Sequence, residues 1–118
     1  MRGAATDLAR LAAGGGEGAI WTLEGSEDLN ANLVRFESGK AEVVGEHVND
    51  EVDVLFVGLS GAGAVTVDGE PHPLEVGRVV LAPKGSRRSV GCETESVAYL
   101  TVHRRRGPVA VGGRPQRR

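Results

Sequence analysis

The sequence has little of what stabilises small secreted domains or crosses membranes. Its 118 residues include one cysteine, Cys92, so no disulfide forms within the chain, which suits a reducing compartment. No apolar run approaches the roughly 20 residues that a membrane-spanning helix needs. Arg2, Asp7 and Arg10 interrupt the N-terminal segment, and a signal peptide is therefore not expected. These features predict a cytoplasmic protein with no membrane partner.

Aromatic residues are also scarce, and the charge is unevenly distributed. Trp21, Phe36, Phe56 and Tyr99 are too few and too scattered for a base-stacking platform. Residues 104–118 carry six arginines and no acid, whereas the rest of the chain has a net charge of −8. An acidic body repels nucleic acid, so nucleic acid is not an expected partner. The basic segment, which contains Gly and Pro, is interpreted as a flexible, solvated tail.

What the sequence has instead is a series of short runs rich in Val, Leu and Ile, separated by Gly, Pro, Asn or Asp. About nine such runs follow one another between residues 19 and 104, without helical periodicity between them. This spacing predicts an all-β sandwich or barrel. Asp68–Gly69 predicts a two-residue hairpin, and Gly61 and Gly63 are interpreted as a hairpin bend between two strands. Thr6 is expected to cap a short helix over residues 7–13.

A chain of this length is expected to form one domain. The N-terminal helix and a leading strand are assigned to residues 1–29 and the barrel to residues 30–104. The basic tail then comprises residues 105–118.

A first motif lies in the stretch GKAEVVGEHVNDEVDVLFVG. Gly39 is followed by five residues and then by Gly45, a glutamate and His47; Glu51 follows after three residues and Gly58 after six more. The spacing is that of G-x5-H-x-H-x3-E-x6-G, with Gly45 in place of the first histidine.

A second motif follows eighteen residues after the first. Gly77 is followed by five residues, Pro83, one residue, Gly85, two residues, Arg88, three residues and Cys92. The spacing is that of G-x5-P-x-G-x2-H-x3-N, with Arg88 in place of the histidine and Cys92 in place of the asparagine. The two motifs in this order resemble those of the cupin superfamily, over roughly residues 30–104.

The resemblance implies a double-stranded β-helix, or jelly-roll barrel, that forms a homodimer. It also implies that motif residues line the barrel, where cupins hold Fe, Mn, Ni or Zn through three histidines and a glutamate. Of these ligands the sequence keeps His47 and Glu51, so the metal site is expected to be degenerate. Side chains alternate along a strand, and the residues then expected to face the interior are Glu51, Asp53, Leu55 and Val57, with Val52, Val54 and Phe56 on the other side.

Three hypotheses for the interior follow. In the favoured one, Arg88 replaces the metal and neutralises Glu51 or Asp53, because an unpaired buried charge is costly. No cofactor is then expected, and the barrel binds a small polar or anionic molecule. The ligand-binding residues are His47, Glu51, Asp53 and Arg88.

The two alternatives are enzymes. In one, a divalent transition metal is held by His47, Glu51 and a third donor, and the protein is dioxygenase- or isomerase-like. Candidates for the third donor are Asp53, Asn49, His103, which is in phase with Tyr99 on the last strand, and His72, which is expected in a solvated turn. In the other, a metal-free enzyme uses His47 as a general base and Arg88 to stabilise developing negative charge.

Overall fold

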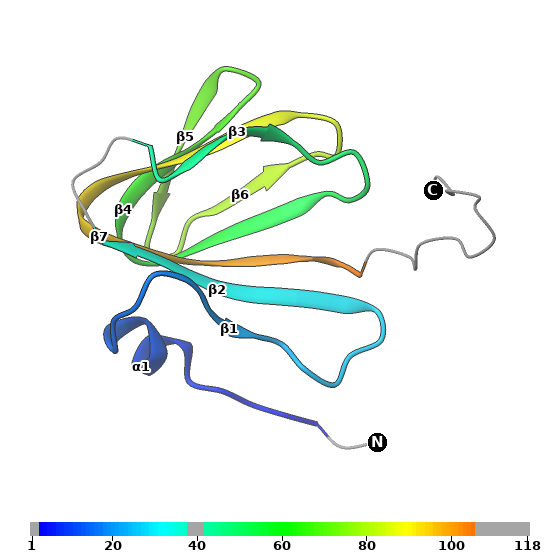
Figure 1. Cartoon of the computed structure of the whole chain (residues 1–118), viewed down its shortest axis with the longest axis vertical. Coiled ribbons are helices and arrows are strands. Elements are labelled where there is room, and N and C mark those ends of the chain that lie inside the picture. Colours follow the sequence, from blue (N-terminus) through cyan, green and yellow to red (C-terminus); the bar gives the residue numbers. More distant parts are fainter. Residues whose placement is uncertain (1–2, 38–41, 106–118) are drawn as a thin grey trace.

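A computed structural model describes residues 3–37 and 42–105 of the chain (Figure 1). These residues form one short helix and seven strands: α1 (Leu8–Ala13), β1 (Gly18–Thr22), β2 (Leu29–Glu37), β3 (Val44–Val48), β4 (Val54–Val67), β5 (Glu70–Glu75), β6 (Val79–Ala82) and β7 (Arg87–Arg104). The predicted tail lies outside the described residues from position 106 onward. In the described part of the chain, no helix is long and apolar enough to cross a membrane.

The strands pair antiparallel in the order β1-β2-β7-β4-β5, with β3 added on β7 and β6 added on β4. The two long strands, β4 and β7, each contribute to two layers. The C-terminal part of β7 pairs with β2 and with the start of β4, whereas its first residues pair with β3 and with the end of β4. The sheet therefore folds over on itself (Figure 1), and the prediction of an all-β jelly roll is confirmed.

Glycines in the middle of β4 allow this strand to bend from one layer to the other. The register between β4 and β7 shifts between Gly58 and Ser60 and again between Gly61 and Gly63. Gly61 has φ of +67°, which favours glycine. The sequence predicts two strands separated by a hairpin bend here. The structure instead has one continuous strand that bends, because each half has a different partner strand.

Two local predictions have different outcomes. The hairpin at Asp68–Gly69 is confirmed, with positive φ at both residues, and it joins β4 to β5. The helix cap at Thr6 is wrong, because α1 begins one residue later than expected. Asp7 is the N-cap, and its carboxylate accepts a hydrogen bond from Arg10 N at 3.1 Å.

The main core lies between the two layers and contains aliphatic side chains from both. Val54, Phe56, Val97 and Tyr99 come from one layer, and Val65, Leu74, Val90 and Cys92 from the other. A second, smaller cluster lies on the outer face of the first layer, where α1 packs against the sheet. Its buried members are Ala12, Leu33 and Ala98.

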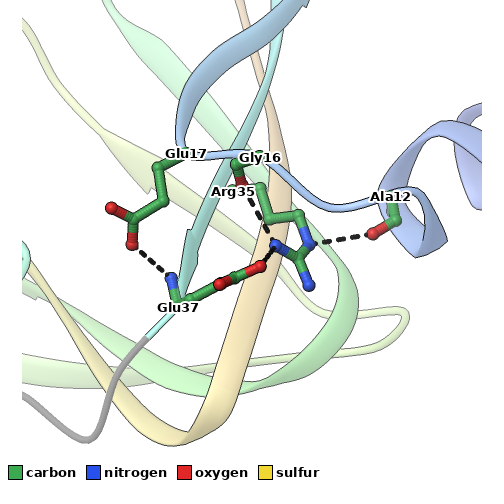
Figure 2. A network of polar contacts seen from close by, with 5 residues as sticks. All are labelled: Ala12, Gly16, Glu17, Arg35 and Glu37. Carbon is green, nitrogen blue, oxygen red and sulfur yellow. Dashed lines mark hydrogen bonds and ion pairs between the residues drawn. The ribbon is translucent and has the colours of Figure 1, made fainter.

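Polar contacts fasten the N-terminal segment to the end of β2 (Figure 2). The guanidinium of Arg35 donates to Ala12 O and Gly16 O, both at 3.0 Å, and forms an ion pair with Glu37. Glu37 N in turn donates to the carboxylate of Glu17 at 2.7 Å. The segment that precedes the barrel is therefore part of the folded unit.

Candidate functional site

Several chain segments meet at one end of the barrel, which we call the mouth. The loop 49–53 between β3 and β4 contacts the turn 83–86 between β6 and β7: Gly85 N donates to Asn49 O at 2.7 Å, and Lys84 N donates to Asp53 Oδ1 at 2.8 Å. At the end of β7, Arg104 Nη2 donates to Glu51 O at 2.9 Å. Most residues singled out in the sequence thus lie at this mouth.

Arg88 lies inside the mouth, as the sequence predicts. It lies on the same face of β7 as the core residues Val90 and Cys92 and is 2% exposed. Its Nη2 donates to Pro83 O at 2.7 Å and to Ser86 Oγ at 3.0 Å. Its Nε–H is fully buried and has no hydrogen-bond partner among the described residues. A strong donor at the inner face of the mouth is therefore unused.

The charge of Arg88 is not neutralised by a direct contact with Asp53. That carboxylate is exposed and accepts from the Lys84 amide instead, so the predicted pair with Asp53 does not form. Burial lowers the pKa of Arg88 below its ordinary value, and the carboxylates of Asp68 and Asp53, acting at longer range, oppose that shift. Arginine nevertheless stays protonated at neutral pH, so a positive charge is buried beside this turn.

The predicted orientation of the start of β4 is wrong by one residue. Val52 and Phe56, 1% and 6% exposed, belong to the core, whereas Glu51, Asp53 and Leu55 are exposed. The side chain of Asn49 accepts from the amides of Glu51 and Val52, and this turn sets the phase in which the strand begins. The phase also follows from burial, because apolar side chains gain from leaving water and carboxylates do not.

His47 lies on β3 as the register partner of Arg88, but its ring is exposed. Its Nδ1 donates to Gly45 O at 2.9 Å, a contact made within its own strand. The carbonyl of the residue that replaces the first motif histidine thus orients the retained histidine.

The other two histidines have different surroundings. His103 is half-buried and points to the interior side of β7, in phase with Tyr99; its Nδ1 donates to Arg104 O at 2.7 Å and its Nε2 lies 3.4 Å from Asn30 Nδ2. The prediction that His72 lies in a turn is wrong: it lies inside β5, opposite Val65. Its Nε2 lies 3.7 Å from a carboxylate oxygen of Glu70.

The interior face of β2 and β7 also carries polar residues that the sequence analysis did not single out. Asn30 is opposite His103, and Asn32 is opposite Thr101. Further along the same face, Val34 is opposite Tyr99, and the face becomes apolar. The sequence does indicate this face, because the polar residues recur at every second position in phase with core residues. We call Asn30, Asn32, Thr101 and His103 the polar strip.

Surface hollows lie outside the barrel. One, with a volume of about 500 Å³, is lined by residues that include Thr66, Ser89 and Glu93. Another, of about 540 Å³, is lined by Glu46, Val48 and Arg87, which are the outward neighbours of the motif residues His47 and Arg88. Cys92 of the second motif also lines the first hollow, but neither hollow is lined by His47, Glu51 or Arg88, so they are not assigned to the motif chemistry.

Tyr99 marks the boundary between the polar strip and the core. Its ring packs against Phe56 with centroids 5.7 Å apart and planes tilted by 43°. Burial raises the pKa of its phenol well above the ordinary value of 10.0. The phenol is therefore uncharged over the whole range in which the protein is expected to work.

This pKa leads to a testable prediction, since Tyr99 is the single tyrosine in the sequence. In the folded protein, the tyrosinate absorbance should appear at a pH clearly above 10. Because the folded-state pKa is above the unfolded one, the associated stability is complete below pH 10 and is lost as the pH rises toward the folded-state pKa. Titration in guanidinium should give the ordinary value; a folded-state titration at that same value would show that Tyr99 is solvated.

Comparisons with known proteins agree with this fold and motif pattern. The family model of the cupin domain matches residues 32–103. The chain belongs to the cupin family. No curated protein matches the chain.

Among solved structures, TT1209 from Thermus thermophilus is 27% identical, with a TM-score of 0.69 over 87% of this chain and 98% of that one. BH2720 from Bacillus halodurans has a TM-score of 0.75 over 91% and 85% of the two chains, but at 14% identity it shows the fold alone. A sugar phosphate isomerase of the cupin superfamily from Silicibacter pomeroyi is 25% identical, with a TM-score of 0.56 over 66% and 51%.

The residues at the mouth do not fit the metal that the family implies. A catalytic metal site typically needs three protein ligands. Within residues 3–37 and 42–105, no group of three or more His, Cys, Asp or Glu side chains is placed to hold a metal ion. His47 and Glu51, the two retained motif positions, are both exposed, and a buried guanidinium stands at the third.

Proposed function

We propose that this cupin binds a small anionic molecule at the barrel mouth, with Arg88 as the principal contact, and that it does so without a resident metal. The observation that carries the proposal is the unpartnered, buried Nε–H of Arg88. A buried donor without a partner is costly, and an anion that accepted from it would remove that cost.

The surroundings of Arg88 also favour an anion over a cation. Its Nη2 is held by Pro83 O and Ser86 Oγ, so the guanidinium plane is fixed before a ligand arrives. Pre-organisation of this kind reduces the entropy lost on binding. A carboxylate or phosphate can accept from a fixed guanidinium through more than one oxygen. A divalent metal ion beside the same group would be repelled.

The relation to a sugar phosphate isomerase suggests an anion that such enzymes handle, but not the same chemistry. Isomerase or dioxygenase activity through a metal at His47 and Glu51 would need a third donor beside them, and no group of three such donors lies together in the part of the chain that the structure describes. We therefore assign binding, and not turnover, as the function that the geometry supports best.

The test is calorimetric titration with hexanoate, gluconate, hexyl phosphate and glucose 6-phosphate. At least one should bind, and Arg88→Met should weaken that binding about 10- to 100-fold, because a hydrogen bond to a charged group contributes about 1.5–3 kcal/mol. Arg87→Met is the matched control: it removes the same charge from the adjacent exposed position and should leave the affinity nearly unchanged. Failure of all four anions to bind, or an equal loss in both variants, would overturn the proposal.

A further inference from the structure

The polar strip lies on the interior face opposite the layer that carries Arg88. Its four residues occupy two adjacent rows across β2 and β7, at the mouth end of both strands. All four are half-buried, so they combine partial shelter with access from solvent. In packed double sheets the two inner faces are about 10 Å apart. A molecule of several carbons held by Arg88 would therefore reach the strip.

The strip offers uncharged donors and acceptors in fixed directions. Asn32 Oδ1 accepts from Thr22 Oγ1 at 2.7 Å, which leaves the Asn32 amide nitrogen as a donor. Since His103 Nδ1 donates to Arg104 O, its Nε2 is an acceptor, and it takes a hydrogen bond from the Asn30 amide nitrogen at 3.4 Å. The second N–H and the oxygen of the Asn30 amide are then left for a ligand. The hydroxyl of Thr101 makes no hydrogen bond to the described residues and can serve as either.

This pattern matches a particular ligand chemistry. Hydroxyl groups both donate and accept, so a row of them can satisfy the amide nitrogens of Asn30 and Asn32 and the hydroxyl of Thr101 at once. An apolar chain in the same place would leave these three groups without partners, which is costly. On the core side of the strip, the paired rings of Phe56 and Tyr99 provide an apolar surface for C–H groups.

We infer that the polar strip binds the hydroxyl groups of a polyhydroxylated anion whose acidic group is held by Arg88. This inference rests on the proposed function and extends it to a ligand class. The acidic group is a carboxylate or a phosphate, since a buried guanidinium accepts both. Asn30, Asn32 and Thr101 are then specificity residues that separate hydroxylated anions from plain ones, and His103 holds the Asn30 amide in place.

The experiment compares anions that differ in hydroxyl groups alone. Gluconate is titrated against hexanoate, and glucose 6-phosphate against hexyl phosphate, so that each pair shares its acidic group. The hydroxylated member should bind at least tenfold more tightly in one pair or both. The pair with the larger preference identifies the acidic group.

Variants then place the preference on the strip. Thr101→Val, which keeps the side-chain volume, and Asn32→Leu should each weaken the hydroxylated ligand about threefold to tenfold and leave the plain one unchanged. Thr66→Val makes the same chemical change on the outer face and should have no effect. Melting curves identify any variant that has lost its fold, and the remaining one carries the test.

The possible failures are distinguishable. If hexanoate or hexyl phosphate binds as tightly as its hydroxylated partner in an Arg88-dependent manner, the proposed function stands and the inference about the strip is wrong. If none of the anions binds, both are wrong. A preference for hydroxylated anions that survives in Thr101→Val and Asn32→Leu would also overturn the assignment to the strip.

Discussion

Replacing Gly58 by alanine should destabilise the protein by about 3 kcal/mol or more. A Cβ at this position would lie 1.9 Å from the backbone oxygen of Glu75, a separation that no real methyl group adopts. The backbone itself is also held in place, because Gly58 N donates to Arg78 O at 2.8 Å and Gly77 N donates to Gly58 O at 3.0 Å. Relief would require either the bend of β4 or the turn after β5 to move.

The matched control is Gly45→Ala, on the edge strand β3. Nothing lies within 4 Å of the Cβ that this change would add. Its effect on the free energy of unfolding should stay within about 0.5 kcal/mol, as for other exposed positions. Thermal or chemical unfolding, followed by circular dichroism, measures both variants. Equal stabilities would show that β4 does not pass close to Glu75 in solution.

The bend of β4 also shows why the strand number was predicted imperfectly. A glycine-rich stretch between two apolar runs is typical of a hairpin. In this chain the same glycines let one strand cross from one layer to the other, with β7 following it. A choice between these two outcomes depends on partner strands far away in the sequence, so the local pattern predicts the fold class and not the strand count.

The candidate site, too, was only partly predictable from the sequence. The spacing around Arg88 places it correctly inside the barrel, because β7 pairs with β4 in unbroken register from Arg88 to Cys92. The alternation from Glu51 onward was predicted in the wrong phase, because the cupin motif implies that Glu51 lies inside. The apolar alternation of Val52, Val54 and Phe56 gives the observed phase, which the turn at Asn49 sets. A single-residue shift exchanges the two faces of a strand. Asp53 therefore interacts with the Lys84 amide and not with the interior.

The motif-based view also favoured titratable residues over amides and hydroxyls. His47 and Glu51 were predicted as site residues because they match metal-ligand positions of the motif, yet both are exposed. Asn32 and Thr101, which belong to no motif, lie on the interior face. If the ligand is a polyhydroxylated anion, the loss of the metal histidines is compensated by a cation at Arg88, and the remaining specificity comes from strands outside the two motifs.

The second large effect is expected at Leu33, on the outer face of β2. Leu33 is 0% exposed because α1 covers it, with Ala12 and Ala98 as its buried neighbours. Leu33→Ala should lower the free energy of unfolding by about 2–5 kcal/mol, as expected for a large apolar side chain removed from a packed cluster. The cluster is small, and the residues that surround it come mostly from the segment before the main barrel motifs.

Leu29→Ala provides the control, since Leu29 lies four residues earlier on the same face of the same strand but is 50% exposed. It should cost less than about 1 kcal/mol. The single tryptophan, Trp21, is the register partner of Leu33 and gives a local signal. Its fluorescence should shift to the red in Leu33→Ala, below the melting transition, and stay unchanged in Leu29→Ala.

Arg35 determines how such a result would be interpreted. Its guanidinium holds the carbonyls of Ala12 and Gly16, so α1 is fastened to β2 by hydrogen bonds as well as by Leu33 (Figure 2). If both leucine variants lose little stability, then α1 does not cover the sheet in solution and the Arg35 contacts do not persist there. If Leu33→Ala alone is strongly destabilised, the N-terminal segment is an integral layer of this cupin, because a side chain of β2 can be that important only when something outside the barrel buries it.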